Sequence, residues 1–294
     1  MASYSHAPRS LGVVLFATLL GTVFAWLAGS NGVQVSGLSV FVICAALAFA
    51  VNWLAFIPAA IAKTEKYYDL VGAVTYISIL IAACALSAPL DLRAIVVAAM
   101  VAVWSLRLGT FLYQRIHSVG GIDQRFDKIK VNPPRFLVAW TLQAVWAIIT
   151  AAAAIVVISA SERVPLDIFF WIGAAVWAFG FAMEVIADRQ KGAFRADPDN
   201  EGKFINTGLW SWSQHPNYFG EITLWTGIVI IAFPLLSGWS FLVFASPMFI
   251  TLLLTKISGI NMLDAAAEKR WGDDEDYQEY RRKTSVLIPL PPKA

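Results

Sequence analysis

Eight stretches of mostly apolar residues, each long enough to cross a lipid bilayer, follow one another along this chain. A helix needs about 20 apolar residues to cross a hydrocarbon core of ~30 Å, where every backbone polar group must be paired within the protein. The chain is 58% hydrophobic and 14% charged, whereas a soluble domain carries about 25% charged residues. We therefore predict an all-α fold, a polytopic integral membrane bundle of about eight transmembrane helices. The predicted spans are residues 11–29, 38–62, 70–88, 93–113, 137–160, 166–187, 219–236 and 239–257.

The two ends of this series leave alternatives open. The first stretch follows Arg9, as the apolar region of a signal peptide would, but no clear A-x-A cleavage site comes after it. We therefore treat it as a retained span. The last two stretches are separated only by residues 237–238, so a re-entrant pair is the alternative for them.

The basic residues predict the orientation in the membrane, because Lys and Arg accumulate in cytoplasmic loops. With the N-terminus inside, all but two of the 22 Lys and Arg fall in inward segments, and the exceptions are Arg93 and Arg163. We therefore expect both termini in the cytoplasm, and polar chemistry on that face. The expected outward loops are short, at residues 30–37, 89–92, 161–166 and 237–238.

We predict one membrane domain over residues 1–294, with N-terminal helices in 1–63 and a core in 64–294 that carries the cytoplasmic face. The charged tail, 264–283, contains interspersed aromatic residues and predicts one or two amphipathic helices in the cytoplasm. A net charge of +2 is too small to indicate a nucleic-acid partner.

The segment 184–221, EVIADRQKGAFRADPDNEGKFINTGLWSWSQHPNYFGE, combines polar and aromatic residues at a membrane boundary. Charges at membrane depth are costly and mark functional sites. Glu184 and Glu221 lie near predicted helix ends, so solvation at the interface is the alternative for them. The polar residues of interest are Glu184, Asp188, Arg195, Lys203, His215, Asn217 and Glu221.

Basic residues of two inward segments are candidates for a phosphate-rich ligand, since guanidinium groups hold phosphate oxygens in pairs and Lys acts as a point charge. They are Arg195 and Lys203, with Arg107 and Arg115 from the 107–136 loop. The alternative is that these basic residues only set the membrane topology and contact anionic lipid headgroups. Arg107 lies one turn inside its span and therefore needs a partner there.

Asp69 begins the third span directly after Tyr67 and Tyr68. One interpretation is that the carboxylate of Asp69 only stabilises the helix start through a favourable interaction with the helix dipole. The other is an acid that faces a lipid-accessible cavity and stays protonated there as a hydrogen-bond donor.

No metal site is expected. His215 is the only His of its segment and has no second His or Cys at ligand spacing. Cys44 and Cys84 lie inside apolar runs, as small buried hydrophobic residues do.

The segment GLWSWSQHPNYFGEITLWTG, 208–227, resembles the signature of the steroid 5-alpha-reductase C-terminal domain family, which includes bacterial DUF1295-type membrane proteins. Sterol C14 reductases and isoprenylcysteine carboxyl methyltransferases carry related segments. The resemblance extends to D-R-Q-K-x-x-F-R at 188–195, to Y-R-R-K-T-S-V-L-I-P at 280–289 and to R-L-G-x-x-L-x-x-R at 107–115. It covers roughly the C-terminal two thirds of the chain.

The resemblance implies a reductase core in the bacterial inner membrane, with a role in lipid metabolism. NADPH would deliver hydride from the cytoplasmic side to a carbon–carbon double bond conjugated with a carbonyl. The substrate would be a lipophilic, steroid- or isoprenoid-like molecule that enters from the bilayer among the membrane lipids. The implied cofactor contacts are Arg107, Arg115, Asp188, Arg195, Lys203, Asn217 and Glu221, to which we add His215 and Tyr218 of the same segment.

The chain departs from the family pattern at its catalytic pair. The family's Glu falls on or beside Asp69, and its Tyr falls on Trp104, which cannot act as an acid. Gln214 occupies a position where the family often has Arg. We predict Asp69, or the hydroxyl of Tyr68 beside it, as the acid that polarises the carbonyl.

Two other functions remain open. One is an S-adenosylmethionine-dependent membrane methyltransferase of the isoprenylcysteine or phospholipid type, which shares the C-terminal motif. The longer body of about eight spans, together with Arg195 and Lys203, favours the phosphate-rich cofactor instead. The other is a non-enzymatic lipid-binding protein, against which stands the clustering of polar residues at one membrane face.

Overall fold

The computed structural model describes residues 7–118 and 126–293, and only the backbone of 115–118. Seven of its helices are long and apolar enough to span a membrane, or eight when a bent helix pair counts as one span. The chain is thus an integral membrane protein with a polytopic helical bundle, as predicted. The first six helices are α1 (Ala7–Ala28), α2 (Val40–Ala62), α3 (Tyr68–Leu86), α4 (Leu92–Ser118), α5 (Pro133–Thr150) and α6 (Ala152–Ile158). The others are α7 (Ile168–Ala196), α8 (Pro216–Ala232), α9 (Ala245–Leu252), α10 (Ile260–Trp271) and α11 (Glu275–Lys283).

Short segments connect these helices. A two-stranded antiparallel hairpin occupies part of the first expected outward loop, so the fold is not helical throughout. Five of the remaining elements are 3₁₀-helices or, for η6, a π-helical segment. The strands are β1 (Gln34–Val35) and β2 (Leu38–Ser39). The short helical segments are η2 (Pro198–Asn200), η3 (Gly208–Ser211), η4 (Phe233–Leu235), η5 (Gly238–Phe244) and η6 (Leu253–Ile257).

The fifth predicted span, 137–160, is not one straight helix. It breaks at Ala151, and α5 and α6 meet at an angle of 53°. Neither Pro nor Gly occurs at the break, although sharp kinks usually need one. All seven residues of α6 are buried, so packing on every side of this short helix accompanies the change of direction.

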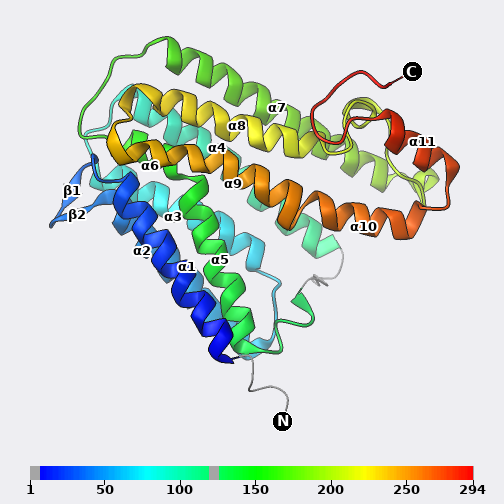
Figure 1. Ribbon diagram of the computed structural model, residues 1–294, viewed down its shortest axis with the longest axis horizontal. Coiled ribbons are helices and arrows are strands. Elements are labelled where there is room, and N and C mark those ends of the chain that lie inside the picture. Colours follow the sequence, from blue (N-terminus) through cyan, green and yellow to red (C-terminus); the bar gives the residue numbers. More distant parts are fainter. Residues whose placement is uncertain (1–6, 119–125, 294) are drawn as a thin grey trace. The chain divides into compact units, whose positions relative to one another are not determined.

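The chain divides into two compact units. The first comprises residues 1–167 and 232–245. In it α5 packs against both α1 and α2, α2 against α3, and α3 against α4 (Figure 1). Aromatic rings fill the space between α2, α3 and α5: the ring of Tyr68 lies 4.7 Å from Phe126 and 5.2 Å from Trp140.

The second unit comprises residues 168–231 and 246–294. It contains α7, α8, α10 and α11, and therefore most of the polar segment 184–221. Two helices, α10 and α11, occupy most of the charged tail, 264–283. Asp274 caps α11, because its carboxylate accepts hydrogen bonds from the backbone amides of Asp276 and Tyr277.

Candidate active site

Glycines bring α7 and α8 of the second unit into backbone contact (Figure 1). A Cβ on Gly220 would lie 2.6 Å from the backbone nitrogen of Glu184 and 2.7 Å from the carbonyl oxygen of Gly180. One heptad further along α8, a Cβ on Gly227 would lie 2.7 Å from the carbonyl oxygen of Gly173. Such small-residue contacts are typical of helices that pack closely in membranes.

This close packing gathers the polar residues of the two helices. Asn217, in the first turn of α8, donates a hydrogen bond of 3.2 Å from Nδ2 to Oδ1 of Asp188 on α7. Glu184 and Asp188, one turn apart on α7, are only 3% and 7% exposed. Glu221 follows Asn217 by one turn and is half-buried. Burying carboxyl groups costs free energy unless they are paired. Such groups at membrane depth usually mark a functional site, so we treat this cluster as the candidate site of the unit.

His215 lies just before α8 and is 6% exposed. Its ring stacks on Tyr218, with centroids 5.5 Å apart, and its Nε2 lies 3.4 Å from Oδ1 of Asp264 on α10. Burial lowers the pKa of His215 to about 4, and the positive charges of Lys191 and Arg281 act in the same direction. The Asp264 contact opposes the shift but is long for a hydrogen bond, so the imidazole is neutral at physiological pH.

The C-terminal tail is joined to the motif that contains His215. The side chain of Gln214 donates hydrogen bonds to the carbonyl oxygens of Arg281, at 3.2 Å, and Thr284, at 2.8 Å. The backbone nitrogen of Gln214 donates to Ser285, and Ser213 Oγ donates to the carbonyl of Leu287 at 2.8 Å. Gln214, at the position where the resembled family often has Arg, thus holds the tail in place.

Arg195 and Lys203 lie at the exposed rim of this unit, in the last turn of α7 and in the loop after η2. Aromatic side chains fix the loop beside Lys203. The ring of Phe204 lies 5.1 Å from Tyr277, and Trp271 Nε1 donates a hydrogen bond to the carbonyl of Gly202. Lys203 therefore lies in a loop held by contacts of both neighbouring residues, whereas Arg195 lies in the last turn of a helix.

The predicted acids lie in the first unit. Asp69 is half-buried in the first turn of α3, as expected from the sequence. The hydroxyl of Tyr68 donates a hydrogen bond of 2.9 Å to the carbonyl of Ala139, and Gln143 donates to the carbonyl of Tyr68. Tyr68 therefore joins α3 to α5, a structural task that the sequence did not reveal.

Arg107 is half-buried on α4, and its guanidinium group lies 5.4 Å from the ring centroid of Phe111. The side chain of Arg115 lies outside the described residues. Trp104 is buried, and Tyr76 of α3 meets it edge-on with ring centroids 5.1 Å apart. Tyr76, two turns from Asp69 on α3, thus brings a phenol beside the position where the resembled family has its own Tyr.

Sequence reasoning missed Tyr76, Asp264 and Arg281. Asp264 and Arg281 approach each other to 3.4 Å across α10 and α11, and Arg281 also lies 2.6 Å from Glu268. The charged pattern of 264–283 predicted one or two helices, but it did not indicate that a residue of this segment contacts His215. That relation joins residues about fifty positions apart and depends on tertiary structure.

The second unit carries side chains of the kinds that bind a dinucleotide. Phosphate groups require exposed cations, which Arg195 and Lys203 provide. Hydroxyl and amide groups require acceptors and donors in a protected place, which the Asp188–Asn217 pair provides. The residues present therefore fit such a cofactor.

Comparisons with known proteins identify relatives. The model of a family described as "protein of unknown function (DUF1295)" matches residues 55–284, which is most of the chain. The chain is 26% identical over 123 residues to 3-oxo-5-alpha-steroid 4-dehydrogenase 1 of Bos taurus, covering 41% of this chain and 42% of the relative. It is 24% identical over 178 residues to an uncharacterized protein of Schizosaccharomyces pombe, covering 50% of this chain and 52% of the relative. The matches thus span about half of each curated relative or less. No solved structure matches significantly.

Proposed function

Because the chain belongs to the DUF1295 family, we propose that it is a membrane-embedded, NADPH-dependent reductase. Its substrate in this proposal is a lipophilic molecule, steroid- or isoprenoid-like, with a carbon–carbon double bond conjugated to a carbonyl. The bovine relative supports an oxidoreductase, since its name describes a dehydrogenase of 3-oxo-steroids. The observation that carries the proposal is the buried polar cluster that the glycine contacts of α7 and α8 create, in a unit that also exposes Arg195 and Lys203.

In this proposal the second unit binds the cofactor. Arg195 and Lys203 neutralise its phosphate groups, and the Asp188–Asn217 pair orients its polar groups through hydrogen bonds. Glu221 and His215 complete the site, and Tyr218 holds the neutral imidazole by stacking. NADPH supplies the hydride when bound.

The first unit supplies the acid. Asp69, kept protonated, donates a hydrogen bond to the substrate carbonyl oxygen, where negative charge develops as the double bond is reduced. The family resemblance also implies Arg107 and Arg115 as contacts for the cofactor phosphates. The hydrogen bond from Tyr68 to Ala139 favours Asp69 over Tyr68 as the donor.

We also propose the location of the protein. It lies in the bacterial inner membrane with both termini in the cytoplasm, where NADPH is available. This orientation places nearly all Lys and Arg inside, and the substrate reaches the protein laterally from the bilayer among the membrane lipids.

A thermal-shift assay on the detergent-purified protein tests the cofactor. A ligand that binds only the folded state raises the melting temperature by mass action. We expect NADPH to raise it, and NADH and S-adenosylmethionine to have little effect. The Arg195→Ala, Lys203→Ala and Asn217→Ala variants should bind NADPH about fivefold or more weakly.

The matched control is Lys269→Ala, which removes another exposed lysine of the same unit. It should retain the wild-type affinity for NADPH. A shift with S-adenosylmethionine alone would assign the protein to the methyltransferases. Equal NADPH affinity in all four variants and the wild type would overturn the site.

A further inference from the structure

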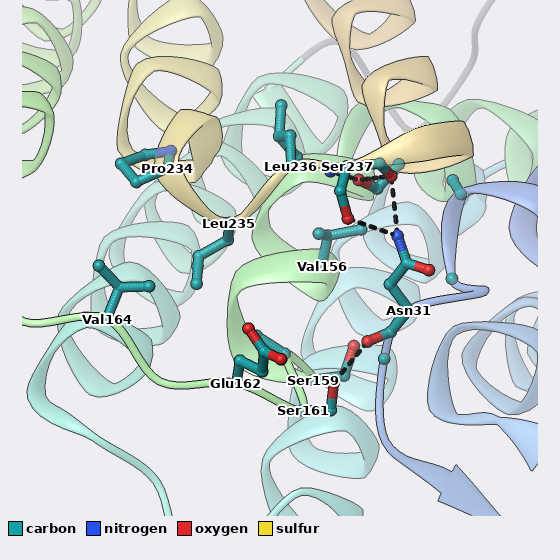
Figure 2. Close-up of a pocket in the computed structure, with 15 residues that line it drawn as sticks. Asn31, Val156, Ser159, Ser161, Glu162, Val164, Pro234, Leu235, Leu236 and Ser237 are labelled. Carbon is teal, nitrogen blue, oxygen red and sulfur yellow. Dashed lines mark hydrogen bonds between the residues drawn. The ribbon is translucent and has the colours of Figure 1, made fainter.

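The first unit contains a cavity of about 390 Å³ that the candidate active site does not use (Figure 2). Volumes of this order accommodate small organic ligands. Its walls come from the end of α1, the end of α6 with the loop that follows, and the η4–η5 connection. These segments include three of the four loops that the basic residues predict on the outer side of the membrane.

Hydrogen bonds between and within the wall segments fix the lining of the cavity. Asn31 Nδ2 donates to both the carbonyl oxygen and Oγ of Ser237, at 2.7 and 2.9 Å. Ser161 Oγ donates to the carbonyl oxygen of Asn31 at 2.7 Å. Ser240 Oγ donates to the carbonyl of Ser237, and Ser159 Oγ to that of Ile155. A ligand therefore meets a preformed wall and loses little affinity to reorganisation.

The same hydrogen bonds determine which ligand chemistry fits. They use the donor groups of Asn31 and Ser161 within the wall, so these two exposed side chains offer mainly acceptor lone pairs to the cavity, whereas Ser159 and Ser240 are only 1% exposed. Glu162 adds a carboxylate, and no Lys, Arg or His occurs among the described residues that line the cavity. The lining thus favours a ligand with hydrogen-bond donors and a positive charge.

The nearest basic residue in sequence does not supply the counter-charge. Arg163 follows Glu162, but its guanidinium group donates hydrogen bonds of 3.2 Å to the carbonyls of Ile158 and Ser87. It also lies 3.7 Å from Asp91. No ion pair of Glu162 occurs among the residues that the structure describes. Its charge is therefore available to a ligand.

The other side of the cavity is apolar. The side chains of Val156, Val164 and Leu235 line it together with Glu162 (Figure 2). Three candidate spans, ending at Ala28, Ile158 and Leu235, stop at or beside this wall, and the next begins at Gly238. Span ends lie where the hydrocarbon core meets the headgroup region. A ligand here has an apolar part as well as a charged one.

We propose that this cavity binds the ammonium group of an amphiphile, with Glu162 as its counter-ion and the Val156–Leu235 side as its apolar contact. The ligand is either a free long-chain amine or the ethanolamine headgroup of a membrane lipid, which share this chemistry. The site is independent of the proposed reductase activity.

Dodecylammonium, below its micelle concentration, is the probe for detergent-purified protein, with dodecanol as its neutral counterpart. We expect the amine to raise the melting temperature and the alcohol to have a much smaller effect. Glu162→Gln should weaken amine binding about fivefold or more. Val156→Trp, which fills the cavity, should abolish it.

Glu201→Gln is the matched control, because Glu201 is an exposed carboxylate of the other unit. It should bind dodecylammonium as the wild type does. Equal binding to wild type and Glu162→Gln, or equal effects of amine and alcohol, would overturn the proposal. In nanodiscs, displacement of the amine by phosphatidylethanolamine but not by phosphatidylglycerol identifies the lipid source. Displacement by neither lipid identifies the free amine.

Discussion

The guanidinium group of Arg93 lies 3.1 Å from the carboxylate of Asp167, although the two residues are far apart in sequence. Arg93 is 1% exposed and also donates a hydrogen bond of 2.8 Å to the carbonyl of Pro165. Arg93 and Arg163 are the two basic residues that the positive-inside pattern leaves on the outer side. Both are held by carboxylates and backbone carbonyls, so their charges serve the packing of the first unit.

Asp167→Asn should therefore destabilise the protein, because it leaves the buried charge of Arg93 without its counter-ion. Breaking a fully buried pair costs about 3–5 kcal/mol. Asp167 is 31% exposed, so solvent screening reduces the expected loss to about 1–2 kcal/mol. Thermal unfolding in detergent measures it, with the exposed Asp273→Asn as a control that should change nothing. A melting temperature equal to that of the control would show that the pair adds no stability.

The membrane spans were predictable because lipid imposes a simple rule on the sequence. Every predicted stretch corresponds to a candidate span in the structure, since each must carry about 20 apolar residues. The break at Ala151 was not predictable, because no Pro or Gly marks it and its cause lies in the packing around α6. The pairing of Arg93 with Asp167 likewise depends on tertiary structure.

Gly220→Ala should separate α7 from α8, because the new Cβ would lie within 2.7 Å of backbone atoms, which cannot move as a flexible side chain does. Overpacking of this kind costs about 1–3 kcal/mol. The substitution should also weaken NADPH binding, since it displaces Asp188 from Asn217.

Gly192→Ala provides the matched control for this substitution. Gly192 lies on α7, and nothing occurs within 4 Å of its Cβ position. Replacing it should stabilise the helix by about 0.5–1 kcal/mol. If Gly220→Ala and Gly192→Ala had the same melting temperature, the close contact of the two helices would be wrong.

The polar segment 184–221 was recognisable from the sequence, because charges and amides at a membrane boundary are unusual. Its internal pairing was not. Nothing in the spacing of Gly180 and Gly220 indicated that the two helices touch there, and the Asp188–Asn217 bond follows from that contact. The contact between Asp264 and His215 was not predictable either, because it also depends on tertiary structure.

The stability of the protein should fall between pH 6.5 and 4 because of His215. Its pKa is about 4 in the folded protein, against an ordinary value of 6.5. The unfolded chain therefore binds the proton more tightly, and acidification favours unfolding until both states are protonated. The full effect is about 3 kcal/mol, from 1.36 kcal/mol for each pKa unit.

His215→Asn removes this titration, so its melting temperature should change less between pH 7.5 and 5 than that of the wild type. Carboxyl groups titrate in both proteins, and the difference between the two curves isolates the imidazole. Parallel curves for wild type and variant would show that His215 takes up its proton as easily in the folded state as in the unfolded one.

Substitutions at Asp69 and Tyr68 should have different effects, because Asp69 is the proposed acid and Tyr68 joins two helices. Asp69→Leu keeps the approximate size of the side chain but removes its hydrogen-bond donor, so turnover of an enone lipid with NADPH should fall about 100-fold or more. The NADPH-induced rise in melting temperature should persist. Tyr68→Phe should instead lower the melting temperature, through loss of about 1 kcal/mol from its bond to Ala139, and leave turnover nearly unchanged. If Tyr76→Phe alone abolished turnover, the acid would be the phenol beside Trp104, and the role proposed for Asp69 would be wrong.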